Sequence, residues 1–321
     1  YDGNGNTGGS VPVDTQAYSA WGTVIIQGNT GNLEKNDLIF AGWSRSVANT
    51  DYPFTAGSTL QIESSSITLY ACWVPVYAYT ISSGKATITK YNGSESVIDI
   101  PSMLDGYPVT AIGMDSFNGN SVLTKVTIPS GVISIGVDAF RACAALDSVT
   151  IPSTVTTIGT SAFCGCAALS SIVLPEGLTS LAGYVFENCA GLKSASLPST
   201  LAYVPTGCFS GCSGLVSVSL PSKAWYIMDC AFSGCTSLTT ITIPASVTQI
   251  RCTAFTGCIG LKDVDVNATT PPEIDVVMGD KPSMLFGDCS ALEHIYVPTS
   301  NVTTYQETGR WDIYSALIVG L

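Results

Sequence analysis

The chain has 321 residues, of which 46% are hydrophobic and 11% are Asp, Glu, Lys or Arg, and its formal net charge is −12. This apolar, charge-poor composition excludes a disordered chain. The acidic balance argues against a nucleic acid or an anionic membrane surface as the partner, because both attract basic surfaces. No run of about 18 apolar residues occurs, so we expect no membrane insertion.

Residues 1–75 differ in pattern from the rest of the chain. They contain the segments Phe40–Trp43 (FAGW) and Thr68–Trp73 (TLYACW). These segments resemble the Listeria–Bacteroides repeat module of internalin B type. The resemblance implies a small β-grasp-like domain that serves bacterial surface proteins as a stalk or spacer, with Val74–Val76 as the junction that follows it.

A period of 23 residues governs the chain from residue 117 onward. Phenylalanine recurs at this interval, a leucine follows each phenylalanine six residues later, and an apolar-proline pair keeps the same step. One such unit cannot bury its own apolar side chains, whereas stacked units join theirs into a continuous core. The pattern therefore predicts a solenoid. The phenylalanines in phase are Phe117, Phe140, Phe163, Phe186, Phe209, Phe232 and Phe255.

The order of elements within one unit can also be predicted. Residues 148–151 (SVTI) alternate polar and apolar side chains, which indicates a strand with Val149 and Ile151 inward. Pro152 ends this strand because proline has no N–H for the sheet ladder. Val155 and Ile158 indicate a second strand, which a turn and a short helical or 3-10 segment follow. Stacked units would then place like strands side by side in parallel sheets.

The repeat unit A-F-x-x-C-x-x-L-x-x-I-x-I-P-x-x-V-x-x-I-G resembles the leucine-rich repeats of BspA-like surface proteins. The resemblance implies a mainly β, right-handed leucine-rich-repeat solenoid with short helical or 3-10 turns. We expect this domain at 76–321, with an N-terminal cap and first repeat at 77–116 and regular repeats at 117–266. An insertion and a C-terminal cap would occupy 267–321, because the Phe255 to Phe286 interval is 31 residues and Tyr305 and Trp311 depart from the pattern.

Seven of the twelve cysteines lie three residues after a repeat phenylalanine and so form one column along the solenoid. We predict a ladder of small buried side chains, because parallel side chains do not converge as metal ligands must. Cys164 is expected to face outward and Cys208 inward. Cys230 and Cys252 fall in adjacent coils, where they either form a disulfide or remain free thiols. Mostly free thiols in an exported protein would suit an anaerobic bacterium. The column cysteines are Cys143, Cys166, Cys189, Cys212, Cys235, Cys258 and Cys289.

The sequence offers little for catalysis, and we expect no enzyme, no metal and no cofactor. It has one histidine, His294, and it lacks the G-x-S-x-G and H-E-x-x-H motifs. Asp263 and Asp265 point to the outer face of a strand, and the phase of the next coil places them opposite His294 and Tyr296. This C-terminal patch on the predicted concave sheet is interpreted as a polar sheet end, as a contact site for a cation or ligand, or as a hydrolytic centre.

Two adjacent coils carry aromatic residues in the second strand, where most other coils carry small or polar ones. Tyr203 and Tyr226 share a column, Trp225 precedes Tyr226, and Tyr184 lies in the preceding coil. Exposed clustered aromatic side chains suit a protein surface or the flat face of a sugar. Packing against a neighbouring molecule or cross-strand aromatic pairing is the alternative. These four residues are our candidate ligand-binding residues.

Solenoids usually bind partners through an extended concave sheet, and here that sheet presents outward columns of Ser and Thr. Together with the adhesion that the resemblance implies, this predicts a non-enzymatic recognition protein, secreted by a bacterium or held on its surface. Its partner would be a host matrix protein or a bacterial surface protein. The alternatives are a carbohydrate-binding module with a glycan partner, or a scaffold or spacer. The sequence begins at Tyr1 in mid-pattern and without a signal peptide, so we expect a longer exported protein around it.

Overall fold

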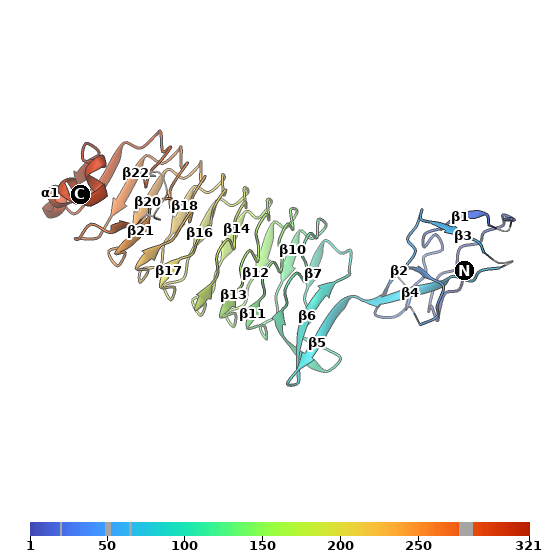
Figure 1. The fold of residues 1–321 in the computed structure, drawn as a ribbon. Helices are drawn as coiled ribbons and strands as arrows, with labels where there is room; N and C mark the ends of the chain where they lie inside the picture. Colours follow the sequence, from blue (N-terminus) through green and yellow to red (C-terminus); the bar gives the residue numbers. More distant parts are fainter. Residues whose placement is uncertain (20, 49–52, 64–65, 276–284) are drawn as a thin grey trace. The chain divides into compact units, whose positions relative to one another are not determined.

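The structure is a computed structural model that describes residues 1–19, 21–48, 53–63, 66–275 and 285–321. It divides into two compact units, one formed by Tyr1–Ala78 with Tyr91–Gly93 and the other by Tyr79–Lys90 with Ser94–Leu321. The second unit is a stack of coils whose strands lie side by side in chain order (Figure 1). In the described part of the chain, no helix has the length and apolar character needed to cross a membrane.

Antiparallel strands build the N-terminal unit around two tryptophans. Trp43 is fully buried, and its indole N–H donates to the carbonyl oxygen of Gln27 at 2.9 Å. Trp73 donates its indole N–H to the carbonyl oxygen of Gly3 at 3.0 Å. The two sequence segments that set this region apart therefore supply its core. The strands pair as β1 (Thr23–Ile25) with β3 (Thr59–Gln61), and β2 (Leu38–Ser44) with β4 (Tyr70–Pro75).

A hairpin of β5 (Tyr77–Ser82) and β6 (Lys85–Tyr91) leads into the solenoid. Its two-residue turn requires positive φ, which Ser83 and Gly84 adopt with φ of 50° and 71°. Next, β7 pairs in parallel with the first regular strand β10, and β9 pairs in parallel with both β6 and β11. These early strands are β7 (Val97–Asp99), β8 (Met103–Leu104) and β9 (Tyr107–Ile112).

Each regular coil contributes a first and a second strand. These strands pair in parallel with their counterparts in the next coil, except that the described sheets are interrupted between residues 150 and 171, 181 and 203, and 219 and 240. Cα partners in the regular coils are one repeat period apart, as in Val126 with Val149 and Thr157 with Ser180. The predicted parallel sheets and their register are therefore confirmed. The first strands are β10 (Lys125–Thr127), β12 (Ser148–Thr150), β14 (Ser171–Val173), β16 (Ser194–Ser196), β18 (Ser217–Ser219), β20 (Thr240–Ile243), β22 (Asp263–Val266) and β24 (His294–Val297). The second strands are β11 (Ser134–Ile135), β13 (Thr157–Ile158), β15 (Ser180–Leu181), β17 (Tyr203–Val204), β19 (Tyr226–Ile227), β21 (Gln249–Arg251) and β23 (Glu273–Asp275).

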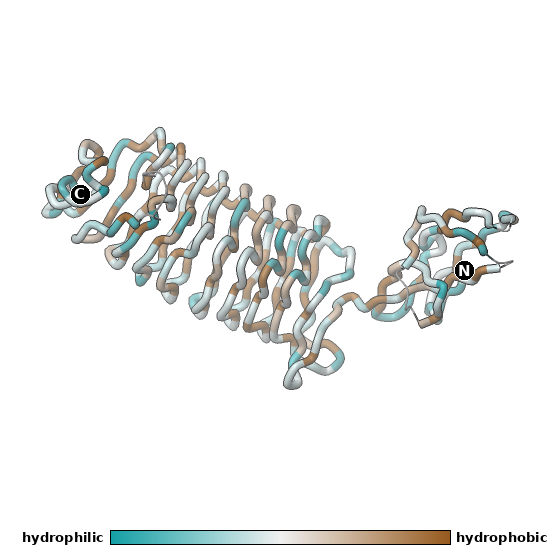
Figure 2. The backbone as a smooth tube through the Cα atoms, viewed as in Figure 1, coloured by the Kyte–Doolittle hydropathy of each residue, from teal (hydrophilic) through white to brown (hydrophobic). Residues whose placement is uncertain are grey.

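The repeat phenylalanines form one continuous stack through the solenoid. From Phe117 to Phe286, successive ring centroids lie 4.7–5.8 Å apart, and the six rings from Phe140 to Phe255 are fully buried. Hydrophobic segments recur from coil to coil (Figure 2). The coils thus share one core, as the period predicts. Val149 and Ile151, which we expected inward, are half-buried.

The cysteine column runs beside this stack. Each column Sγ lies 3.0–3.2 Å from the carbonyl oxygen of the repeat phenylalanine one coil earlier, so each S–H can donate a hydrogen bond. Burial raises the pKa of Cys143 to about 11 and that of Cys189 to about 12. Such thiols stay protonated and unreactive at neutral pH. The predicted ladder of small buried side chains is confirmed.

The predictions for the cysteines outside this column are confirmed only in part. Cys208 is buried, as predicted. Cys164, which we expected to face outward, is buried and not exposed to solvent: the Glu187 carboxylate of the next coil lies beside it, with Oε2 at 3.5 Å from Sγ. Cys230 and Cys252 are not joined by a disulfide in the structure, so of the two alternatives the disulfide is not formed.

Aromatic groups hold the C-terminal segment against the end of the array. Tyr305 donates its hydroxyl to Ala268 O, and Trp311 donates its indole N–H to Pro272 O, both at 2.7 Å. Both rings are buried. Residues 276–284 of the expected insertion lie outside the described residues. The segment consists of η1 (Thr299–Asn301), α1 (Val302–Glu307), η2 (Gly309–Tyr314) and β25 (Ile318–Gly320).

Candidate functional site

Three aromatic residues at β17 and at the start of its neighbour β19 form the first candidate site: Tyr203 and Trp225 are exposed and Tyr226 is half-buried. Tyr203 on β17 pairs in register with Tyr226 on β19, which confirms that they share a column. The rings of Trp225 and Tyr226 stack with centroids 5.3 Å apart at 24°. Tyr203 and Trp225 are 37% and 45% exposed, while the following Val204 and Ile227 are buried. We call Tyr203, Trp225 and Tyr226 the aromatic cluster.

Tyr184 belongs to a different part of the coil. It lies at the corner after β15, with a positive φ of 60°, and it is 39% exposed. Its ring lies over Gly207 of the next coil, where an added Cβ would come within 2.3 Å of a ring carbon. The structure therefore places Tyr184 in the corner column of Gly207, outside the strand column of Tyr203 and Tyr226.

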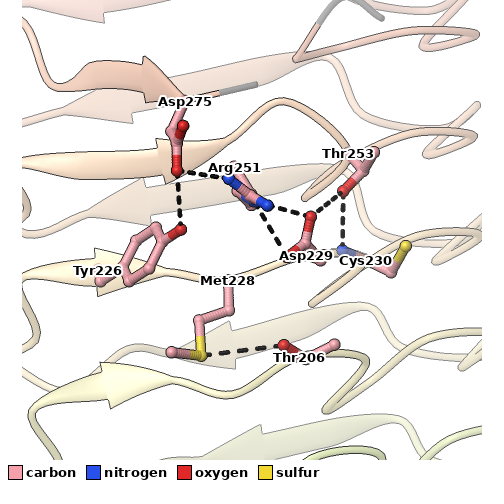
Figure 3. Close-up of polar contacts among 8 residues, drawn as sticks. All are labelled: Thr206, Tyr226, Met228, Asp229, Cys230, Arg251, Thr253 and Asp275. Carbon is pink, nitrogen blue, oxygen red and sulfur yellow. Dashed lines mark hydrogen bonds and ion pairs between the residues drawn. The ribbon is translucent and has the colours of Figure 1, made fainter. Parts of the chain in front are cut away.

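A polar network adjoins the aromatic cluster (Figure 3). Arg251 on β21 donates from Nε to both carboxylate oxygens of Asp229, at 2.9 and 3.0 Å, and from Nη1 to Asp275 Oδ2 at 2.5 Å. Tyr226 donates its hydroxyl to the same Asp275 oxygen at 3.2 Å. Thr253 donates to Asp229 Oδ1 at 3.4 Å and accepts the backbone N–H of Cys230 at 3.1 Å. The network thus joins three successive coils.

The electrostatics of this network favour the charged guanidinium. Burial lowers the pKa of Arg251, but the hydrogen bonds to Asp275 and Asp229 outweigh this effect and raise it above its ordinary value. Burial also raises the pKa of Tyr226, the nearby Arg251 opposes this, and the hydrogen bond to Asp275 adds to it. The phenol is therefore neutral at physiological pH and available as a donor.

Sequence reasoning missed the network for an identifiable reason. Arg251 occupies a column in which earlier coils have Gly136 and Gly159, so its presence was a detectable departure from the pattern. Asp275, however, pairs with Arg251 one residue out of the repeat phase, because it follows the start of the insertion. The fixed repeat period could not place it.

The C-terminal patch has the register that the sequence predicts. Asp263 on β22 pairs with His294 on β24, and Asp265 pairs with Tyr296. His294 Nδ1 lies 3.0 Å from Asp263 Oδ1, and the rings of His294 and Tyr296 stack at 5.4 Å. Thr242 of the preceding coil donates to Asp265 Oδ2 at 3.2 Å. Among the described residues, no three His, Cys, Asp or Glu side chains are grouped so that they could hold a metal ion.

The C-terminal patch continues a longer polar surface. The outward side chains of β14, β16, β18 and β20 are exposed, and all but Val173 are Ser or Thr. We call this surface the hydroxyl face. The hydroxyl face over β14–β20 carries no charge, so Asp263 and Asp265 make the patch an acidic end next to a neutral surface.

The N-terminal unit contains a cavity that the sequence did not indicate. Its volume is about 1050 Å³, and its lining includes Tyr1, Asp14, Tyr18, Leu60 and Glu63. Tyr18 donates its hydroxyl to Asp14 Oδ2 at 2.8 Å, and this hydrogen bond raises the pKa of Tyr18. Among the described residues that line this cavity, Asp14 and Glu63 are acidic and none is Lys, Arg or His, so no acidic side chain faces a basic one across it.

The stacked phenylalanines, the parallel strands and the constant repeat step define a leucine-rich-repeat solenoid. A family model of the BspA type leucine rich repeat region, in six copies, matches residues 96–216 and 204–308. The chain belongs to this BspA-type leucine-rich-repeat family. A comparison with curated proteins finds no match.

Solved structures agree with this assignment. A leucine rich repeat protein of T. pallidum is 30% identical, with a TM-score of 0.54, over 58% of this chain and 88% of that one. A leucine rich cell surface protein of Faecalibacterium prausnitzii A2-165 is also 30% identical, with a TM-score of 0.56, over 70% of this chain and 69% of that one. The mainly β leucine-rich-repeat fold predicted from the sequence is confirmed.

Proposed function

We propose that this chain is a non-enzymatic recognition and adhesion protein of a bacterium, secreted or held at the cell surface. Its partner is a protein of the host matrix or of another bacterial surface, bound through the solenoid. The observation that carries the proposal is the hydroxyl face with its acidic end. Successive coils in strict register expose side chains that the core does not need, and exposed columns of this kind are how solenoids present a binding surface.

The C-terminal patch makes one end of this surface acidic, so the two ends differ in charge. Two carboxylates on the same outward face of β22 attract a basic segment of a partner, whereas the neutral hydroxyl face provides hydrogen-bonding donors and acceptors without repelling it. His294 and Tyr296 add stacked rings beside the carboxylates. The patch therefore sets the register and the on-rate of a partner that lies along the sheet.

The supporting comparison for the location is the F. prausnitzii protein, which is described as a cell surface protein. The internalin B-type resemblance of residues 1–75 adds a stalk or spacer to the same proposal. The twelve cysteines form no disulfide in the described part of the chain, which is consistent with an anaerobic habitat.

The test is binding of the full chain to a panel of extracellular-matrix proteins and to intact bacterial cells. The variant Asp263→Ala with Asp265→Ala should weaken binding about tenfold, and the loss should shrink at high salt. The matched comparison, Ser194→Ala with Ser196→Ala, changes the same two columns of the hydroxyl face in an earlier coil. It removes hydroxyl groups but no charge, so it should weaken binding less than the patch variant and without the dependence on salt. Equal losses in both variants, or none in either, would refute a role for the patch.

One observation favours a second function. The aromatic cluster and its polar network are exposed or half-buried and lie at the other sheet, where a carbohydrate-binding module would carry its platform. A spacer or scaffold requires neither surface. If the chain is only a spacer or scaffold, it should bind nothing on a protein panel or on a glycan panel.

A further inference from the structure

The second-strand sheet carries a mixed aromatic and polar face that recognition through the hydroxyl face does not use. The Cα pairing of β17, β19, β21 and β23 places four exposed or half-exposed side chains in one column. Arg251 and Asp275, two positions further along their strands, point to the same side, as alternate strand residues do. One half of this face is aromatic and the other is polar. The column is Tyr203, Tyr226, Gln249 and Glu273.

We propose that this face binds a neutral glycan. A pyranose ring stacks on the aromatic cluster, and its hydroxyl groups bond to the polar side chains of the next two coils. The inference rests on the proposed role of the solenoid as a recognition surface, and it names the ligand class of the aromatic cluster.

The aromatic half is prearranged for stacking. Trp225 is 45% exposed although its ring already stacks on Tyr226, so it presents a flat apolar surface to solvent. The Tyr226 hydroxyl is held by Asp275 at 3.2 Å. Rings that are fixed before binding lose little conformational entropy when a ligand covers them. The C–H face of a pyranose is the complementary shape, because flat rings attract flat apolar faces.

The polar half is prearranged for hydroxyl groups. Arg251 bridges Asp229 and Asp275, whose side chains are still 36% and 34% exposed. Each carboxylate oxygen can accept more than one hydrogen bond, so these groups retain acceptors that face solvent. Gln249 donates to Glu273 at 3.3 Å and keeps its amide oxygen as an acceptor. Sugar hydroxyls both donate and accept, and this mixture of acceptors and donors matches them.

The charge of the face selects a neutral ligand. Asp229, Asp275 and Glu273 supply three carboxylates, and Arg251 supplies one compensating guanidinium. A sulfated, sialylated or uronic-acid glycan would bring its own negative charge to this surface and be repelled. The whole chain, with a net charge of −12, repels such ligands as well.

The test is isothermal titration calorimetry of the full chain with linear tetrasaccharides of glucose, mannose and galactose, and with a uronic-acid tetrasaccharide as the acidic counterpart. At least one neutral tetrasaccharide should bind, and the acidic one should bind at least about tenfold more weakly. Trp225→Ala with Tyr203→Ala should lower the neutral affinity by at least about tenfold, because two stacking contacts are lost. The matched control is Thr179→Ala with Ser180→Ala, which changes the same two columns in an earlier coil and should leave affinity within about twofold.

Gln249→Ala provides a second variant that keeps both rings, and it should weaken binding without lowering the melting temperature by more than a few degrees. Three results would overturn the inference: no binding of any neutral tetrasaccharide, equal binding of the acidic one, or unchanged affinity in the aromatic variant. If no glycan binds and the aromatic variant instead loses binding to a matrix protein, the proposed recognition function stands and the assignment of a glycan ligand fails.

Discussion

The phenylalanine stack allows a quantitative prediction for Phe209. Its ring is fully buried between Phe186 and Phe232, with centroids 5.6 Å away on either side. Each stacked pair contributes about 0.5–1.5 kcal/mol beyond burial of area. Phe209→Leu keeps most of the buried apolar volume but loses both contacts, so unfolding free energy should fall by about 1–3 kcal/mol. Phe209→Ala also leaves a cavity and should cost about 3–5 kcal/mol.

The assay is urea unfolding followed by circular dichroism, with Val173→Ala as the control because Val173 is 77% exposed on the hydroxyl face. The control should change stability by less than about 0.5 kcal/mol. Because each coil contacts only its neighbours, the Phe209 variants should also broaden the transition. A loss below about 0.5 kcal/mol in Phe209→Leu would refute the claim that the stacked rings join the coils into one core.

Four further predictions follow, three on the thiols and one on the corner at Gly207. A thiol titration of denatured but unreduced protein should count all twelve cysteines, since none forms a disulfide in the described part of the chain; a count below twelve would reveal a disulfide. In the native protein, the half-exposed Cys230 should react first, and labelling followed by peptide mapping identifies it. Burial raises the pKa of Cys143 to about 11 and of Cys189 to about 12, above the value of 9.0 for an unperturbed thiol. Their stabilising contribution is therefore complete below pH 9 and is lost as pH rises from about 9 to 12, because the unfolded chain releases these protons first; thermal melts that stay flat to pH 11 would contradict this. Gly207→Ala should destabilise by about 1–2 kcal/mol, since φ is 59° and the Tyr184 ring occupies the Cβ position. Much of that loss should disappear in a Tyr184→Ala background, which a double-mutant cycle measures.

The 23-residue repeat period determined which features of the fold and of the candidate sites could be predicted from the sequence. The constant repeat step placed Tyr203 opposite Tyr226, and the same phase carried across the longer interval placed Asp263 opposite His294. Both predictions need only the side-chain phase, because parallel strands of successive coils pair in a fixed register. The buried cysteine ladder followed from the same argument.

The remaining features depend on individual side-chain contacts, which the position of a residue within the repeat does not determine. Cys164 is buried beside the Glu187 carboxylate of the next coil. The Arg251 network joins Asp229 to Asp275 across the start of the insertion, where the step is no longer constant. Residues 1–75 have no internal repeat, so their sequence did not indicate the tryptophan core, the strand pairing or the cavity.

The most direct test of recognition through the solenoid is amide hydrogen exchange of the full chain. It is measured for the free chain and for the chain bound to a matrix protein or bacterial surface protein that the binding panel identifies. Recognition through the hydroxyl face predicts that the bound partner protects amides of β20, β22 and β24, around the C-terminal patch and the adjoining hydroxyl face. Protection confined to residues 1–75, with unchanged exchange throughout the solenoid, would contradict it.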